Sequence, residues 1–130
     1  MARDLFEAAR DAMAKCHAPY SKFPVGAAIR ADDGSIHAGA NIEVLSFPEG
    51  WCAETTAISH MIMAGRTKIR EVAVFAEKLD LCPPCGGCRQ RLSEFSTPDT
   101  LVYLCDAGGV KKTLRMDELL PYAFVTEVIG

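Results

Sequence analysis

Three cysteines and one glutamate most constrain what this chain of 130 residues can fold into. The triplet Cys52-Ala53-Glu54 is followed, after a gap of 28 residues, by the loop Pro83-Pro84-Cys85-Gly86-Gly87-Cys88-Arg89-Gln90. Thiols at this spacing are typical of zinc ligands. A catalytic zinc has three protein ligands and one open position for water, whereas a structural zinc has four protein ligands. Three thiols beside an acid fit the catalytic pattern, so we expect the fold to bring Cys52, Cys85 and Cys88 to one ion.

Both cysteine clusters lie where the residue pattern predicts the start of a helix. A helix N-terminus presents free amide donors and about half a positive charge, which lowers the pKa of a thiol and favours the thiolate that metals bind. Zinc with three thiolates carries a net charge of about −1, so it activates water less strongly than zinc held by three neutral imidazoles. A base beside the metal is then needed. Glu54, two residues after Cys52, is predicted to accept the proton of the attacking water and to pass protons on to the substrate.

The cysteine pattern also admits other sites. A Cys-x-x-Cys pair in isolation is typical of a structural zinc knuckle or of a redox pair as well. Cys82 and Cys85 have ligand spacing too, and with Cys82 as a fourth ligand the chain would be a non-catalytic zinc module. Pro83-Pro84 forces an extended path away from the helix start, which favours the three-ligand site. Cys16 and Cys105 fall in apolar segments and are predicted to be buried free thiols.

The hydrophobic pattern predicts helices that alternate with strands, with no repeat and no linker. Apolar residues at a spacing of 3.6 predict helices, and short runs of strand formers bounded by turn residues predict strands. The expected helices cover residues 4–17, 52 to a cap at 65, 85–95 and 116–120, and the expected strands cover 23–30, 36–41, 71–76, 100–105 and 110–115. This order predicts one α/β domain over residues 1–130, in which helices layer a sheet.

The overall composition narrows the classes of partner. Apolar residues make up 49% of the chain and charged residues 24%, which is ordinary for a globular domain. The net charge of −3 disfavours a nucleic-acid-binding protein, which needs a basic footprint. Charged residues in the first turns exclude a signal peptide, and no apolar run approaches the ~20 residues that span a bilayer. We expect a cytoplasmic protein with no nucleic-acid partner and no membrane partner.

Five motifs resemble, in order and spacing, those of the small zinc-dependent cytidine deaminases that assemble as homotetramers. They are residues 18–28, Asn41-Ile42-Glu43, Cys52-Ala53-Glu54, residues 84–90 and residues 118–124. The resemblance implies a three-layer α/β/α sandwich on a five-stranded mixed sheet. It also implies one Zn²⁺ per subunit on Cys52, Cys85 and Cys88, with Glu54 as the catalytic proton shuttle.

The resemblance implies a small nucleoside as the substrate. The expected reaction is the hydrolytic deamination of cytidine and 2′-deoxycytidine to uridine and 2′-deoxyuridine with release of ammonia, as in pyrimidine salvage. An alternative within the class is a deaminase of a cytosine-containing antibiotic nucleoside of the blasticidin type. Editing of polynucleotides is disfavoured because the chain is acidic and short and lacks a strip of basic and aromatic residues.

The resemblance also assigns the substrate contacts, which are Phe23, Asn41, Glu43, Ala53 and Phe124. Asn41 and Glu43 would bind the ribose hydroxyls and Phe23 would pack on the base. Phe124 and the loop around Ser46-Phe47 would complete the pocket of a neighbouring subunit. From the residues alone, Asn41 and Glu43 share one face of an extended segment, which is typical of a solvated strand end as well.

Two positions depart from the family pattern. Many members carry Arg directly after Cys-Ala-Glu, where it donates to the ligand sulfurs, whereas this chain has Thr55. Many also carry Asn after Asn-Ile-Glu, whereas this chain has Val44. The thiolate charge must then be compensated by other groups, and we expect the helix dipoles and Arg89 to do so.

Overall fold

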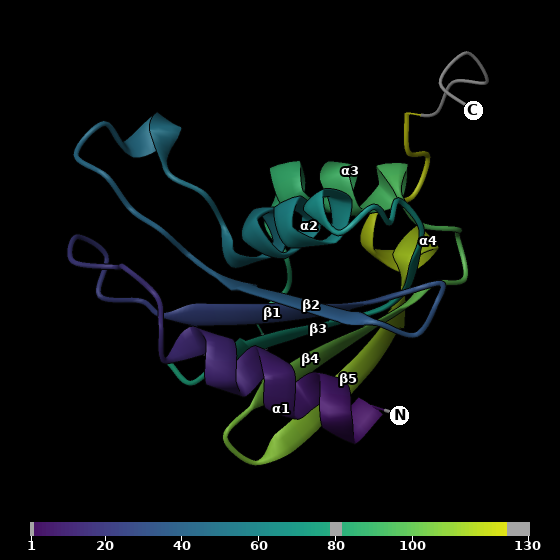
Figure 1. Ribbon diagram of the computed structural model, residues 1–130, viewed down its shortest axis with the longest axis horizontal. Coiled ribbons are helices and arrows are strands. Elements are labelled where there is room, and N and C mark those ends of the chain that lie inside the picture. Colours follow the sequence, from purple (N-terminus) through teal and green to yellow (C-terminus); the bar gives the residue numbers. More distant parts are fainter. Residues whose placement is uncertain (1, 79–81, 125–130) are drawn as a thin grey trace.

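A five-stranded sheet lies between two layers of helices in the computed structural model, which describes residues 2–78 and 82–124 (Figure 1). Helix α1 (Ala2–Met13) covers one face of the sheet. Helices α2 (Ala53–Met63), α3 (Gly86–Glu94) and α4 (Met116–Leu119) lie on the opposite face. The predicted three-layer α/β/α arrangement is therefore confirmed.

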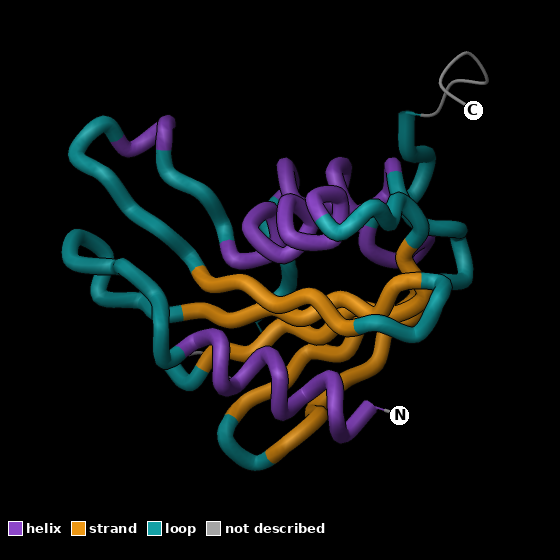
Figure 2. The backbone as a smooth tube through the Cα atoms, viewed as in Figure 1, coloured by secondary structure: helices purple, strands orange, loops and turns teal. Residues whose placement is uncertain are grey.

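The strands lie side by side in one layer below the helices of residues 53–119 (Figure 2). Their order is β2-β1-β3-β4-β5, and the sheet is mixed. Its strands are β1 (Val25–Ala31), β2 (Ile36–Ala40), β3 (Ile69–Ala76), β4 (Leu101–Asp106) and β5 (Gly109–Arg115). Strands β3 and β4 pair in parallel, and the other three neighbouring pairs of the described sheet are antiparallel. A parallel pair needs a crossover connection, which here contains α3. The segment that leads into α3 therefore starts from the carboxyl end of β3.

Alternating residues of the central strands build two apolar cores, one on each face of the sheet. Ala27 and Ile29 of β1 join the core under α2 and α3, whereas Ala28 joins the core under α1. Strand β1 is buried on both faces, and this explains why its sequence is continuously apolar except at Arg30. Arg30 is buried as well, and it donates hydrogen bonds to the carboxylates of Asp4 and Glu71.

Two glycines let the helices approach the sheet closely. A Cβ atom at Gly26 would lie 2.0 Å from the carbonyl oxygen of Ala9 in α1. A Cβ atom at Gly39 would lie 2.5 Å from the backbone nitrogen of Ala57 in α2. Any side chain at these positions would push a helix away from the sheet. Gly39 therefore fixes how closely α2, which begins just after Cys52, is seated on β2.

The element boundaries differ from the sequence predictions by a few residues. Helix α1 stops at Met13, so Cys16 lies beyond the helix and is only partly buried, whereas Cys105 is buried as predicted. The loop over residues 41–51 contains a short 3-10 helix (Phe47–Glu49). Among the described residues, no helix is long and apolar enough to cross a membrane.

Candidate active site

The three cysteines of the sequence motif meet where α2 and α3 begin. Cys52 is the N-cap of α2 and Cys85 is the N-cap of α3, with similar backbone angles of φ −72°, ψ 159° and φ −66°, ψ 166°. Cys88 lies in the first turn of α3 and is buried. The Sγ atoms of Cys52 and Cys85 are 3.7 Å apart, and the three sulfurs lie within 4.8 Å of one another.

The chemistry of these donors fits a zinc ion. Three clustered thiols cannot all ionise without a nearby positive charge. A hydrogen bond with Cys88 lowers the pKa of Cys52, whereas this contact, burial and the charge of Glu54 raise the pKa of Cys88. A cation held by Cys52, Cys85 and Cys88 would supply the missing charge, and a soft thiolate set selects zinc over hard cations such as magnesium. Cys82 lies outside this group of three and lines the adjacent cavity.

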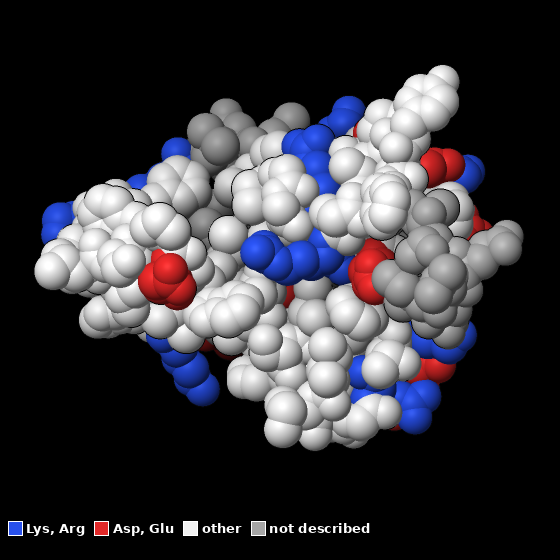
Figure 3. Space-filling model, turned by 90° about the horizontal axis from the view of Figure 1, so that it is seen from above, with Lys and Arg blue, Asp and Glu red and all other residues white. Residues whose placement is uncertain are grey.

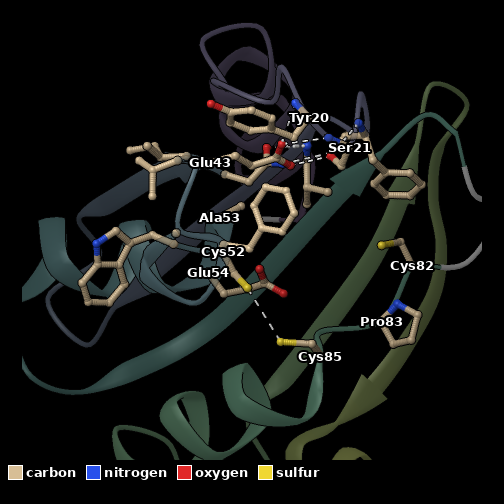
Figure 4. Close-up of a pocket in the computed structure, with 17 residues that line it drawn as sticks. Tyr20, Ser21, Glu43, Cys52, Ala53, Glu54, Cys82, Pro83 and Cys85 are labelled. Atoms are coloured by element: carbon tan, nitrogen blue, oxygen red, sulfur yellow. Dashed lines mark hydrogen bonds between the residues drawn. The ribbon is translucent and has the colours of Figure 1, made fainter.

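Glu54 lies in the first turn of α2 with only 5% of its surface exposed. Its carboxylate points toward the sulfurs of Cys52 and Cys85 (Figure 4). Burial raises the pKa of this carboxyl group above its ordinary value. A carboxyl group with a raised pKa can both accept and return a proton near neutral pH, which suits a general acid and base.

A cavity of about 580 Å³ opens beside the cysteine cluster and is lined largely by apolar side chains. This volume is in the range of small-molecule sites. Four of the five substrate contacts implied by the sequence line this cavity, namely Phe23, Asn41, Glu43 and Ala53. Phe124 does not line it and has 74% of its surface exposed. Figure 4 shows that Cys52 and Cys85 lie at one end of the cavity and Glu43 at the other.

The side chains of Asn41 and Glu43 bind the backbone of the segment before β1. Asn41 accepts a hydrogen bond from Val25 N (3.0 Å) and donates one to Phe23 O (2.9 Å). Glu43 accepts hydrogen bonds from the backbone amides of Tyr20 (3.2 Å) and Ser21 (2.9 Å) and from the Ser21 hydroxyl, which lowers the pKa of the carboxyl group. Both residues therefore shape the wall of the cavity that carries Phe23, a role that the sequence did not reveal.

Aromatic side chains at the cavity include residues that sequence reasoning missed. Tyr20 and Trp51 line the cavity. Phe47, which was expected to reach a neighbouring subunit, lines the cavity of its own chain and packs against Tyr20 with ring centroids 5.4 Å apart. Tyr20 belongs to the motif of residues 18–28, which was the available signal for its position.

Among the described residues, the guanidinium group in contact with the cysteine cluster is that of Arg91, and no such contact is found for Arg89. Arg89 donates to the backbone oxygens of Pro84 (2.8 Å) and Leu119 (3.0 Å), and it thereby links the start of α3 to α4. Arg91 donates to the hydroxyl of Thr55 (3.2 Å) and to the sulfur of Cys88 (3.9 Å). The helical spacing of three between Cys88 and Arg91 could have indicated this contact.

Comparison with known proteins places these features in a family. The model of the cytidine and deoxycytidylate deaminase zinc-binding region matches residues 1–105. The cytidine deaminase of Halalkalibacterium halodurans is 42% identical over 123 residues, which are 95% of this chain and 93% of that protein.

Solved structures agree in fold. The crystal structure of cytidine deaminase from Burkholderia pseudomallei is 37% identical, with a TM-score of 0.90 over 95% of this chain and 99% of that one. The structure of cytidine deaminase from Mycobacterium tuberculosis is 31% identical, with a TM-score of 0.84 over 95% of this chain and 97% of that one. With its three clustered cysteines and buried glutamate, the chain belongs to the zinc-binding cytidine and deoxycytidylate deaminase family.

Proposed function

We propose that the protein hydrolyses cytidine and 2′-deoxycytidine to uridine and 2′-deoxyuridine and releases ammonia, in pyrimidine salvage. The observation that carries this proposal is the buried carboxylate of Glu54 at the point where the cavity meets Cys52 and Cys85. Hydrolysis of an amino-substituted ring needs an activated water and a group that moves protons. The thiols that would hold a water-activating zinc and the carboxylate that would move protons are adjacent here.

The proposed roles of the residues follow from their positions. Zinc held by Cys52, Cys85 and Cys88 would supply a Lewis acid that activates water. Glu54 takes a proton from the water that adds to C4 of the cytosine ring. It then delivers protons to the ring nitrogen and to the departing amine, so that one water is consumed and one ammonia leaves. Its raised pKa fits this alternation between carboxylate and carboxylic acid.

The two ends of the cavity suit the two halves of a nucleoside. The base would lie toward Ala53 and Glu54, with the ring of Phe23 packed against it. The sugar would lie toward Asn41 and Glu43. A carboxylate has about four lone-pair sites, and Glu43 uses three of them within the chain, so one is left for a sugar hydroxyl.

We further propose that the chain assembles as a homotetramer whose pockets are completed by neighbouring subunits. Several large apolar side chains lie on the surface, and a set this extensive is typical of an interaction surface. The most exposed of them are Leu45 (78%), Phe47 (67%), Met63 (84%), Tyr122 (105%) and Phe124 (74%). Uncharged residues also cover much of the face formed by α2 and α3 (Figure 3). Phe124 would then contact the substrate of a neighbour and not that of its own chain.

A cytoplasmic location is proposed on the chemistry of the thiols. All six cysteines are free in the structure, and three of them form the metal group. Thiols persist unpaired in a reducing compartment, and zinc–thiolate sites are common there.

The direct test follows the ultraviolet spectrum of cytidine during incubation with the zinc-loaded protein. Conversion to uridine with release of ammonia is expected, as is its loss after removal of the metal with a chelator. Blasticidin-type nucleosides tested in parallel would reveal the alternative substrate class. Absence of turnover with cytidine and with 2′-deoxycytidine in the zinc-loaded protein would exclude the proposed function.

A further inference from the structure

Arg91, Thr55 and Cys88 form a triangle of polar contacts between α2 and α3. The Nη1 atom of Arg91 lies 3.2 Å from Thr55 Oγ1 and 3.9 Å from Cys88 Sγ. Thr55 Oγ1 lies 3.6 Å from the same sulfur. Both Thr55 and Cys88 are buried, with 3% and 0% of their surface exposed. The sulfur of Cys88 is therefore contacted by one cationic group and one hydroxyl group.

The direction of these hydrogen bonds follows from the chemistry of the groups. A guanidinium group has donors only, so the hydroxyl of Thr55 must accept the hydrogen bond from Arg91. The single hydroxyl hydrogen of Thr55 is then left to point at the sulfur of Cys88. Arg91 thus acts on this sulfur twice, directly through Nη1 and indirectly by orienting Thr55.

The position of Arg91 also favours a negative partner, although the residue is partly open to solvent. Its guanidinium group lies near Gly87, at the N-terminal end of α3. A Cβ atom built on Gly87 would be 3.5 Å from Nη1 of Arg91. A cation at the positive end of a helix dipole is unfavourable unless an anion lies beside it. The thiolate of Cys88 is that anion when a metal is bound.

Arg91 is also the basic residue of α2 and α3 that remains available to contact the sulfur of Cys88. Helix α2 contains no lysine and no arginine, and α3 contains Arg89 and Arg91. Arg89 is committed to two backbone carbonyls. On the face formed by α2 and α3, basic side chains gather near the middle (Figure 3).

We propose that Arg91 and Thr55 together compensate the charge of the zinc–thiolate cluster, in place of the arginine that many family members carry at position 55. The inference rests on the zinc site of the proposed function, but it does not depend on cytidine being the substrate. Arg91 is a positioning residue, because it acts through the sulfur of Cys88. Both donors withdraw electron density from that sulfur and stabilise the loaded cluster.

The test uses the protein loaded with Co²⁺, whose sulfur-to-cobalt charge-transfer absorption reports the electron density on the thiolates. Arg91→Gln keeps an amide donor and removes the charge, so the absorption should move to lower energy. The dissociation constant for Zn²⁺, measured by competition with a chelator, should rise roughly tenfold, the size expected for one hydrogen bond to a charged group. Thr55→Val keeps the shape of the side chain and should produce a smaller shift in the same direction.

A control and a rescue variant separate charge from packing. Arg10→Gln on α1 makes the same change in net charge on the opposite face of the sheet and should alter neither reading. The double variant Thr55→Arg with Arg91→Gln returns a cation to the cluster from α2 and should restore the absorption energy and the Zn²⁺ affinity. The proposal would be overturned if both Arg91→Gln and Thr55→Val had the wild-type absorption energy and Zn²⁺ affinity. It would also be overturned if the double variant bound Zn²⁺ as weakly as Arg91→Gln.

These readings also separate the inference from the proposed function. If the variants shift the cobalt absorption as expected but the zinc-loaded wild type does not deaminate cytidine, the substrate assignment fails and the role of Arg91 stands. If cytidine is deaminated but Arg91→Gln leaves the cobalt absorption unchanged, only the proposed role of Arg91 is wrong, and the substrate assignment stands.

Discussion

Cys52 and Cys85 occupy the same position, the N-cap, of two different helices, and their sulfurs lie 3.7 Å apart. Two helix N-termini therefore face one point, where their free amide groups and dipoles favour thiolates. Helix α2 reaches this point because Gly39 lets it pack closely on β2. Helix α3 reaches it through the connection between the parallel strands β3 and β4. A metal held by these cysteines would thus link elements that the sheet brings together.

The first prediction concerns the ligand set. Cys52→Ala, Cys85→Ala and Cys88→Ala should each lose bound zinc and lower the melting temperature, because metal binding contributes to folding free energy. Cys82→Ala is the matched control and should keep one zinc per chain, since Cys82 lies outside the cluster. Zinc content by elemental analysis and thermal unfolding provide the two measurements. A Cys82 variant that loses its zinc beside a Cys52 variant that retains it would contradict the assignment.

The second prediction concerns Glu54. Glu54→Gln should keep the zinc and the fold, because the amide has nearly the same shape in this buried position. Its turnover of cytidine should fall by at least the ~10²–10⁴-fold that is typical of lost general acid–base catalysis. Steady-state kinetics with zinc analysis of the same sample would measure this, with Glu49→Gln in the exposed 3-10 helix as the control. Near-normal turnover in Glu54→Gln would exclude the proposed mechanism.

The third prediction concerns the sugar contact of Glu43. A hydrogen bond to a carboxylate is worth roughly 1.5–3 kcal/mol, so Glu43→Ala should reduce kcat/KM for cytidine by about 10- to 100-fold. Free cytosine lacks the sugar, so Glu43→Ala should change any turnover of cytosine little. Ser21→Ala removes one partner of Glu43 within the chain and leaves the carboxylate in place, so it should affect cytidine less. If Glu43→Ala impairs cytidine and cytosine equally, then Glu43 supports the loop and not the sugar.

The fourth prediction concerns Phe124 and the proposed assembly. Phe124 lies outside the cavity of its own chain and would complete the cavity of a neighbouring subunit. Phe124→Ala should therefore lower kcat/KM for cytidine, while the metal content stays unchanged. Mixed oligomers test whether it acts between subunits. A Glu54→Gln subunit offers an intact Phe124 to the cavity of a Phe124→Ala subunit. Refolded mixtures should therefore exceed the summed activity of the two variants, and strict additivity would rule out a shared pocket.

The fifth prediction concerns stability at alkaline pH. Burial and a hydrogen bond to Glu71 raise the pKa of Tyr103 from 10.0 to about 12. Between these two values the unfolded chain releases the phenolic proton and the folded chain keeps it, so unfolding becomes easier as the pH rises. The stability advantage of the wild type over Tyr103→Phe should be constant between pH 7 and pH 10, where Glu71 is fully ionised, and should shrink between pH 10 and 12.

Urea unfolding under reducing conditions at a series of pH values measures this advantage. One proton corresponds to a slope of up to about 1.4 kcal/mol per pH unit. Glu71, whose pKa depends on the Tyr103 hydroxyl, stays ionised throughout this range, and the groups that do titrate here are common to both proteins and cancel in the difference. An advantage that does not change across this range would show that Tyr103 titrates normally in the folded protein.

Much of the fold could be predicted because its signals are local. The turn at Asp32-Asp33-Gly34, with φ +89° at the glycine, and the cap at Gly65, with φ +86°, mark the ends of elements through backbone conformations that glycine tolerates best. The elements then fall in the predicted order. The predicted starts of α2 and α3 are one residue early, since Cys52 and Cys85 cap these helices and do not belong to them, whereas α1 begins two residues before its predicted start and α4 begins as predicted.

The sequence by itself determined the residue types and spacings of the site. Cys85 and Cys88 share one turn of a helix, and Glu54 follows Cys52 by two residues, so their relative placement is fixed by local geometry. Only the tertiary structure decided which arginine serves the cluster. Arg89 and Arg91 are two residues apart and equally charged, but they leave α3 on different sides. The side that meets Thr55 depends on how α2 and α3 pack on the sheet, which no short segment of sequence specifies.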